Sequence, residues 1–131
     1  AWGPQDVARL MSDAGIVRNR AKIEAAIAGA RGWLDIVETG ETFADFVWRI
    51  VDGRPRVNHW RSLSDVPAAT AESQALSVAL RARGFRFVGP TVCYAFMQAV
   101  GMVNDHVVAC FRHREVSSLQ PTRPNFRLAS P

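Results

Sequence analysis

The sequence has few of the features that mark several large classes of protein. Its 131 residues include two cysteines, Cys93 and Cys110, which are too few for a disulfide scaffold. No apolar run approaches the roughly 20 residues that span a bilayer, and the amino-terminal stretch lacks the basic start and apolar core of a signal peptide. It also lacks an initiator methionine. We therefore expect one globular, cytoplasmic domain with no membrane partner, from a processed or truncated chain.

Motifs that bind nucleotide phosphates are also missing. The chain contains neither of the glycine-rich loops GxGxxG and GxxxxGK[ST], no serine-hydrolase GxSxG and no CxxC. We therefore expect no nucleotide cofactor.

Lysine is almost absent from a basic sequence. The chain has 16 basic residues against 12 acidic ones, a net charge of +4 and a pI near 10.0, and Lys22 is its one lysine. Arginine binds phosphate through a planar fork of donors, which favours a polyanion as partner. Genomic base composition can also replace lysine by arginine, so the charge alone leaves both interpretations open.

The spacing of apolar residues predicts an all-α domain over residues 1–113. Asn19 is a predicted N-cap for the clearest helix, and Trp33 and Trp48 are expected in the core. The predicted helices run from Pro4 to a C-cap at Gly15, over 20–38, from a cap at Thr42 to just before Gly53, from Thr70 or Ser73 to Gly84 and from Pro90 to about Val100, with a short helical turn over 105–110. Residues 53–68 are predicted to form a loop, no strands are predicted, and residues 114–131 are predicted to form a mobile tail.

A helix–hairpin–helix is predicted over residues 73–101. One helix ends at Gly84, a short apolar segment ends at Gly89, and a new helix begins at Pro90. Free N–H groups at the start of that helix can bind a phosphate, and Arg83 and Arg86 add positive charge. This arrangement favours sequence-independent contact with a DNA backbone. The alternative is a plain helical corner whose apolar residues only pack.

Two short patterns near the end of this region could carry chemistry. His106 and Cys110 are four residues apart and are good Zn²⁺ ligands, with His113 as a candidate third ligand. The alternative is a buried histidine beside a core cysteine. Asp105 next to His106 could serve in acid–base chemistry, or Asn104 or Asp105 could instead cap a helix.

Five segments together resemble one known family. They read DAGIVRNRxKI at 13–23, FADFVW at 43–48, RGFRFVGPT at 83–91, YxFMQAxG at 94–101 and VNDHVVxC at 103–110. The chain resembles the bacterial DNA-3-methyladenine glycosylase I family over about residues 5–112. This family belongs to the helix–hairpin–helix DNA glycosylase superfamily.

The resemblance implies both a fold and a reaction. It implies a helix–hairpin–helix glycosylase-like helical bundle whose N-terminal part is absent here, so that the chain is the C-terminal two-thirds. It implies base-excision repair, in which the N-glycosidic bond of N3-methyladenine in alkylated double-stranded DNA is hydrolysed after base flipping. No lyase step or redox cofactor is implied. We expect a monomer that is associated with the nucleoid when on DNA.

The resemblance also implies site residues. The expected DNA-binding residues lie in and beside the hairpin: Arg83, Gly84, Arg86, Phe87, Gly89 and Thr91. Tyr94 and Ala95 are expected at the base pocket, although the family commonly has serine at the second position. His106 and Cys110 match two of four ligands of a structural zinc. Asp105 is a candidate catalytic residue, because it lies near where related glycosylases keep a catalytic aspartate beyond their hairpin. The family's pocket glutamate is not in this chain.

These expectations leave one main alternative. A non-catalytic helix–hairpin–helix fragment would bind DNA through the hairpin but would lack the base pocket. Such a fragment would bind duplex DNA in a salt-dependent way without releasing a base.

Overall fold

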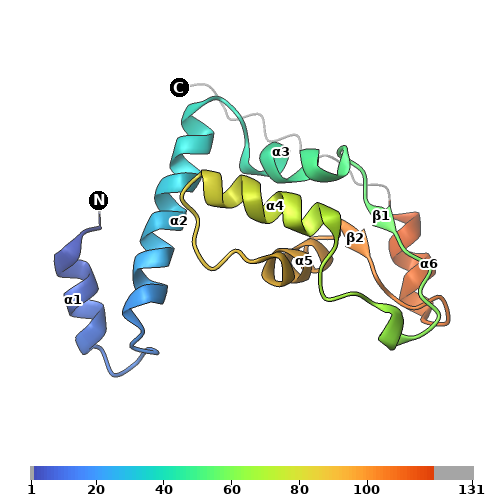
Figure 1. The fold of residues 1–131 in the computed structure, drawn as a ribbon, viewed down its shortest axis with the longest axis horizontal. Helices are drawn as coiled ribbons and strands as arrows, with labels where there is room; N and C mark the ends of the chain where they lie inside the picture. Colours follow the sequence, from blue (N-terminus) through green and yellow to red (C-terminus); the bar gives the residue numbers. More distant parts are fainter. Residues whose placement is uncertain (1, 120–131) are drawn as a thin grey trace.

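The computed structural model describes residues 2–119 of the chain. This part contains six helices and one small sheet (Figure 1). The helices are α1 (Pro4–Ser12), α2 (Arg20–Glu38), α3 (Phe43–Trp48), α4 (Ala71–Ala82), α5 (Pro90–Ala99) and α6 (Phe111–Ser118). The strands are β1 (Arg56–Val57) and β2 (Val103–Asn104), and short 3₁₀ turns cover Arg49–Val51 and Leu63–Asp65.

Helix α2 begins and ends where the sequence predicts. The Asn19 side chain accepts a hydrogen bond from the backbone N–H of Lys22 at 3.1 Å, which satisfies one free donor of the first turn. Helix α1 is shorter than predicted. Its last residue is Ser12 rather than a residue near Gly15, because the Asp13 carboxylate accepts the N–H of Gly15 at 2.8 Å and forms a turn there.

The core lies between helices α3, α4 and α5, with the end of α2 and strand β2 against it. It consists of Ile36, Phe46, Val47, Val51, Leu76, Leu80, Cys93, Tyr94, Met97, Met102 and Val103. The prediction for Trp33 is wrong, because its side chain is 45% exposed. Helix α2 instead buries Ile23, Gly32 and Ile36, whereas Trp48 packs partly buried against the core as predicted.

The small sheet was not predicted. Strands β1 and β2 pair in parallel, with Arg56 beside Val103 and Val57 beside Asn104. The backbone N–H of Asn58 then donates to the carbonyl of Asn104 at 3.1 Å. The sheet therefore fastens the long segment after α3 to the segment that follows α5.

The predicted helical turn over residues 105–110 is wrong. These residues follow β2 without forming a helix, and α6 begins only at Phe111. The Asn104 amide donates to the His113 carbonyl and to the Ser117 hydroxyl, both at 3.0 Å, and so fixes α6 to the sheet. The predicted tail cannot begin at Arg114, since α6 continues to Ser118, and residues 120–131 lie outside the described part.

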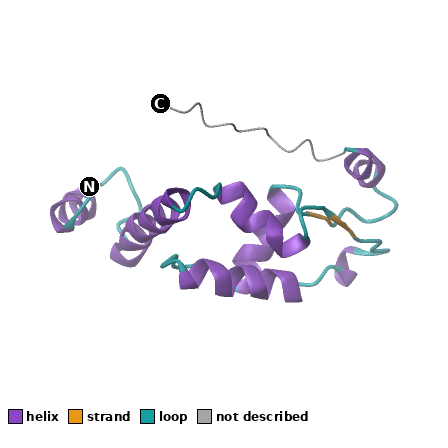
Figure 2. Ribbon diagram, turned by 90° about the horizontal axis from the view of Figure 1, so that it is seen from above, coloured by secondary structure: helices purple, strands orange, loops and turns teal. Residues whose placement is uncertain are grey.

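The elements form an elongated arrangement with three parts. Helices α1 and α2 lie at one end, α3, α4 and α5 in the middle, and the sheet with α6 at the other end (Figures 1 and 2). The connection between α4 and α5 runs beside α2 (Figure 1). Within residues 2–119, no helix is long and apolar enough to cross a membrane.

Candidate nucleic-acid interface and carboxylate cluster

Residues 83–89, hereafter the hairpin, connect α4 to α5 and are held tightly against α2. Gly84 has φ +81, a left-handed conformation that ends α4 and turns the chain. The Phe85 ring packs against Gly29 and Gly32, and a Cβ on Gly32 would lie only 2.2 Å from the carbonyl oxygen of Arg83. The missing side chain at Gly32 thus lets the hairpin backbone approach α2 closely.

The hairpin is also anchored to α4 and α5 through one carbonyl group. The buried Ser77 hydroxyl donates to the Val88 carbonyl at 2.6 Å, and the Cys93 thiol approaches the same oxygen at 3.4 Å. In the described part of the chain, the backbone N–H groups of Thr91 and Val92 donate to no acceptor. The start of α5 therefore offers free donors where a helix attracts an anion.

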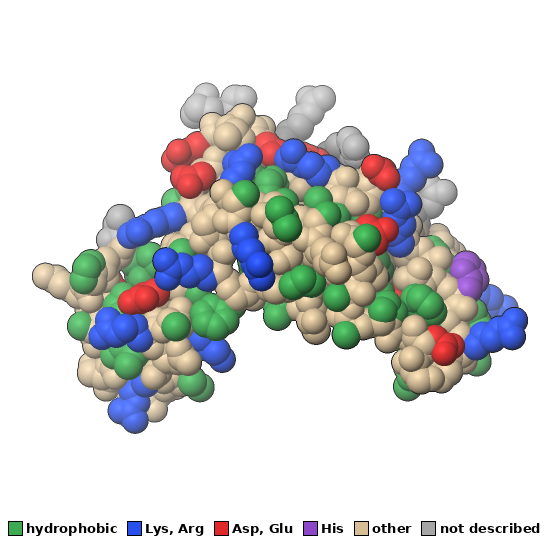
Figure 3. Space-filling model, viewed as in Figure 1, with side chains coloured by type: hydrophobic (Ala, Val, Ile, Leu, Met, Phe, Trp, Pro, Cys, Tyr) green, Lys and Arg blue, Asp and Glu red, His purple; other side chains and the backbone are tan. Residues whose placement is uncertain are grey.

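The predicted arginines of the hairpin have different surroundings. Arg86 is exposed and lines a groove of about 300 Å³ together with Arg20 and Arg31 from α2. The space-filling view shows several basic side chains, and few acidic ones, around the end of the molecule that α1 and α2 form (Figure 3). Arg83, in contrast, is half-buried, with its guanidinium 5.3 Å from the centre of the Phe46 ring. A cation–π contact therefore already engages the Arg83 side chain.

Asp105 is the centre of a hydrogen-bond cluster. Its Oδ1 accepts from Asn58 Nδ2 at 2.7 Å and from Trp60 Nε1 at 2.8 Å, while Oδ2 accepts from Gln98 Nε2 at 2.8 Å. The predicted capping role is wrong, since neither Asn104 nor Asp105 caps α6. Burial alone would raise the pKa of the Asp105 carboxyl, but the surrounding donors outweigh burial and hold it below its usual value.

The Tyr94 hydroxyl faces the same carboxylate from the core side. It is buried and has no hydrogen bond of good geometry among the described residues, although Asp105 is close enough to act on it. Burial, followed by the proximity of Asp105, raises the pKa of Tyr94 above its usual value. Ala95, the second predicted pocket residue, is exposed. Neither residue lines the groove beside Arg86 or the cavity beside Asp105, and their place at a base pocket stays a prediction.

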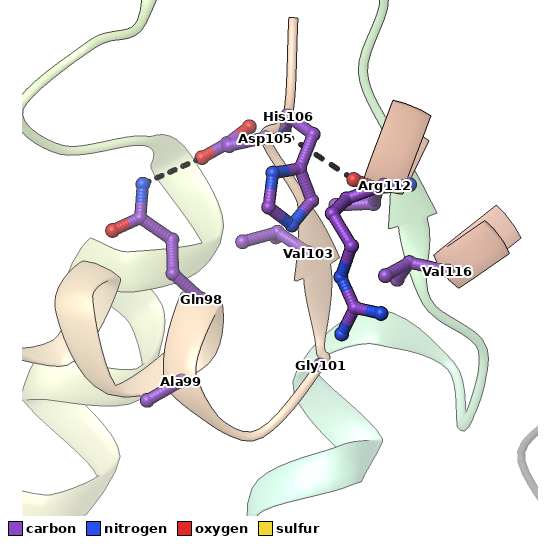
Figure 4. A pocket seen from close by; sticks show the side chains of 9 residues that line it. Gln98, Ala99, Gly101, Val103, Asp105, His106, Arg112 and Val116 are labelled. Atoms are coloured by element: carbon purple, nitrogen blue, oxygen red, sulfur yellow. Dashed lines mark hydrogen bonds between the residues drawn. The ribbon is translucent and has the colours of Figure 1, made fainter. Parts of the chain in front are cut away.

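A cavity of about 430 Å³ opens beside the carboxylate cluster. Its lining combines polar side chains, among them Gln98, Asp105, His106 and Arg112, with the apolar Ala99, Val103 and Val116 (Figure 4). Arg112 is also paired with Glu115 at 2.8 Å.

The two predicted zinc ligands lie together. Cys110 Sγ is 3.9 Å from His106 Nδ1, close to the separation of about 3.6 Å between a sulfur and a nitrogen ligand of tetrahedral zinc. The pair is held by a loop rather than by one helical face. His113 does not join it, because its Nε2 hydrogen bonds to the Asn58 carbonyl at 2.8 Å. Within residues 2–119, no group of three or more metal-binding side chains occurs.

A comparison with known protein families shows to which family this chain belongs. Residues 1–113 match the family model described as methyladenine glycosylase. The chain belongs to the methyladenine glycosylase family. The resemblance that rests on the five sequence segments is thereby confirmed, together with the helical fold.

Individual relatives support the family assignment at high similarity. The chain is 55% identical over 110 residues to DNA-3-methyladenine glycosylase 1 of Escherichia coli, covering 84% of this chain and 59% of that protein. A crystal structure of 3-methyladenine DNA glycosylase I superposes with a TM-score of 0.80 at 52% identity, covering 85% of this chain and 61% of that one. A variant of such an enzyme in complex with 3-methyladenine has a TM-score of 0.78 at 33% identity, covering 83% and 59%. The chain thus spans about three fifths of these relatives.

The sequence does not reveal several residues that this chain uses to build the site. The sequence analysis connects none of Asn58, Trp60 and Gln98 with Asp105. Asn58 and Trp60 lie 47 and 45 positions from Asp105, so no local pattern connects them. Ser77 was also missed, although a small polar residue among the apolar positions of α4 is a signal that could have identified it.

Proposed function

We propose that the chain acts in base-excision repair and hydrolyses the N-glycosidic bond of N3-methyladenine in alkylated double-stranded DNA. The family assignment supports this proposal, as does a similar protein whose structure contains 3-methyladenine. The observation that carries it in this structure is the anchored hairpin, whose fixed backbone leaves free N–H groups at the start of α5.

The hairpin would bind the sugar–phosphate backbone and not the base sequence. The N–H groups of Thr91 and Val92, together with the Thr91 hydroxyl, would hold one phosphate, and the exposed Arg86 would add charge. Gly89 would let the backbone approach that phosphate, and Gly84 would supply the turn. Arg83 has a lesser part in this proposal, because its guanidinium stacks on Phe46.

The proposed reaction needs little acid catalysis. N3-methyladenine carries a positive charge in DNA, so the departing base takes the bonding electrons and leaves neutral. Water adds to C1′ of the sugar and loses a proton, leaving an abasic site. The flipped nucleotide is held outside the base stack during this step.

Asp105 fits one catalytic role better than others. Three donors surround its carboxylate, an environment that favours the ionised form and opposes proton donation. An ionised carboxylate beside the 430 Å³ cavity would stabilise the positive charge that develops on the sugar as the bond breaks. We assign Asp105 this electrostatic role, and not that of a general acid.

His106 and Cys110 would hold one side of a structural zinc site. Their 3.9 Å separation and their donor chemistry fit zinc, and two further ligands would have to come from elsewhere. Zinc bound there would fasten the segment after β2. The metal takes no part in the proposed reaction, and two ligands alone would bind it weakly.

The alternative is a fragment that binds DNA without releasing a base. One observation favours it: neither of the predicted pocket residues, Tyr94 and Ala95, lines the 430 Å³ cavity or the 300 Å³ groove. In either case the proposed partner is alkylated duplex DNA, bound by a monomeric cytoplasmic protein at the nucleoid.

The deciding experiment measures both base release and duplex binding by the 131-residue chain. Alkylated duplex DNA is incubated with the chain, with and without added Zn²⁺, and free 3-methyladenine is quantified. Release at a rate above the spontaneous one supports the glycosylase. Binding without release, at any zinc concentration, supports the non-catalytic fragment. The absence of both base release and duplex binding would refute both functions.

A further inference from the structure

A groove of about 300 Å³ lies between α1 and α2, next to the hairpin. Val7 from α1 is buried at this groove and Ile27 from α2 is half-buried there, so its interior is apolar. Its exposed lining includes Arg20 and Arg31, both from α2. A concave apolar surface with a few charged groups at its edge is typical of a site that binds a ligand.

The positive charge of the groove is only partly neutralised. Its lining has three arginines, with Arg86 as the third, against one carboxylate, that of Glu24. Arg20 is 3.8 Å from Glu24, and because 60% and 42% of the two side chains are exposed, this ion pair is weak. Arg31 donates to the Trp2 carbonyl at 3.0 Å, a neutral partner that leaves its charge and most of its donors available. The groove therefore has a net positive charge that can attract an anion.

The local structure holds these arginines in place. Arg20 is the first residue of α2, whose start is fixed by the Asn19 cap. The bond from Arg31 to Trp2 already orders the Arg31 side chain, so binding a ligand there costs less conformational entropy. Arg86 belongs to the hairpin, and the groove is thereby continuous with the proposed docking surface. The basic side chains around this end of the molecule are visible in Figure 3.

We propose that the groove between α1 and α2 binds a second phosphate of the DNA duplex through Arg20 and Arg31. This inference rests on the proposed function, in which the start of α5 holds a first phosphate. The planar forks of arginine match the oxygens of a phosphodiester, and the apolar interior strengthens the contact by excluding water. Contacts to phosphates fix the register and orientation of a protein on a duplex, and two separate contacts fix them better than one. The groove thereby orients the duplex on the hairpin.

The test replaces Arg20 and Arg31 by glutamine, singly and together, in the 131-residue chain. Arg114→Gln is the matched control, because it removes the same charge from an exposed position in α6, at the opposite end of the molecule (Figure 1). A further double variant, Arg20→Lys with Arg31→Lys, keeps the charge but not the planar fork. Affinity for an alkylated duplex oligonucleotide is measured by fluorescence anisotropy over a range of salt concentrations, and thermal unfolding is followed for each variant.

The slope of log affinity against log salt should report the lost phosphate contact. The double glutamine variant should lower its magnitude by about one, as for one phosphate, and should bind about eightfold more weakly at about 0.1 M salt. Each single glutamine variant should show part of this change. The lysine variant should keep the native slope, since the charge remains. All melting temperatures should stay within about 2 °C of that of the unsubstituted chain, because the substituted side chains are exposed.

Each contrary result has a distinct meaning. A native slope in the double glutamine variant would overturn the proposed contact in the groove and would leave docking by the hairpin intact. An equal loss in Arg114→Gln would also overturn it, because the effect would then come from net charge and not from a bound phosphate. A lysine variant that loses as much slope as the glutamine variant would contradict the proposal, since it keeps the charge. If the unsubstituted chain binds no duplex, the proposed docking function fails, and this inference fails with it.

Discussion

The role of Asp105 can be tested by comparing Asp105→Ala, which removes the hydrogen-bond acceptor, with Asp105→Asn, which removes only the charge. Asp105→Ala removes the acceptor and leaves the side-chain donors of Asn58, Trp60 and Gln98 without a partner. The unpaired donors of Asn58 and Trp60 are partly buried and should each cost about 1 kcal/mol, whereas water replaces the bond of the exposed Gln98 amide. The free energy of unfolding should therefore fall by about 2 kcal/mol.

Asp105→Asn should be much milder. Its amide oxygen can still accept from Asn58 and Trp60, and the Gln98 amide can rotate to present its oxygen to the new NH₂ group. We expect a loss of about 1 kcal/mol, since the bonds become neutral. Base release should fall in both variants, because both lack the charge.

The assay is urea unfolding followed by circular dichroism, with Asp35→Ala on the exposed face of α2 as control. Equal stability of all three variants and the unsubstituted chain would show that the cluster contributes nothing to the fold. An Asp105→Asn variant as unstable as Asp105→Ala would also refute the reasoning. Acid should abolish the advantage of the native residue. Because its folded pKa is lowered, the stabilisation is present above the usual carboxyl pKa of about 4 and is lost as pH falls through the folded value.

Three further predictions concern the hairpin and the two thiols. Ser77→Ala should lower the free energy of unfolding, measured in urea, by about 1–2 kcal/mol, because only the weak Cys93 thiol contact remains at the Val88 carbonyl. The control is the exposed Ser118→Ala, which should cost under about 0.5 kcal/mol. Equal losses in the two variants would contradict the role of Ser77 as an anchor of the hairpin. In the native chain a thiol reagent should modify Cys110 and not Cys93, because Cys93 is 2% exposed and burial raises the pKa of its thiol; equal rates would exclude this difference. Zn²⁺ in excess should slow the modification of Cys110, and His106→Ala should remove that protection; an unaffected rate would argue against a shared metal.

Local signals predicted the helices that carry the hairpin. Asn19 and Thr70 accept hydrogen bonds from the first turns of α2 and α4, and Pro90 begins α5, so each start is set by residues within one helical turn. Gly84 adopts the positive φ that the predicted end of α4 requires. Such boundaries depend on neighbouring residues, and the sequence therefore contains the information that specifies them.

The features that the sequence did not reveal depend on contacts between distant segments. Each strand of the sheet has two residues, too few to show an alternating pattern. The start of α6 was predicted too early, because Asn104 accepts the N–H of His106 at 3.2 Å and holds the following chain outside a helix. The exposure of Trp33 depends on which face of α2 meets the hairpin. That face is selected by Gly32, whose lack of a side chain carries no periodic signal.

In this chain the contacts that support DNA docking are more complete than those that support base release. The contacts that hold the hairpin, from α2 through Gly32, from α4 through Ser77 and from α5 through Cys93, all lie within residues 2–119. Within the same residues the predicted zinc site has only the two ligands His106 and Cys110, and neither Tyr94 nor Ala95 lines the 430 Å³ cavity or the 300 Å³ groove. A surface whose supports are all present keeps its geometry without further residues, whereas a pocket and a metal site need every ligand in place at once. Duplex binding by the 131-residue chain should therefore be more robust than base release. Mutations in the hairpin should weaken both, while mutations at His106 or Cys110 should leave binding unchanged.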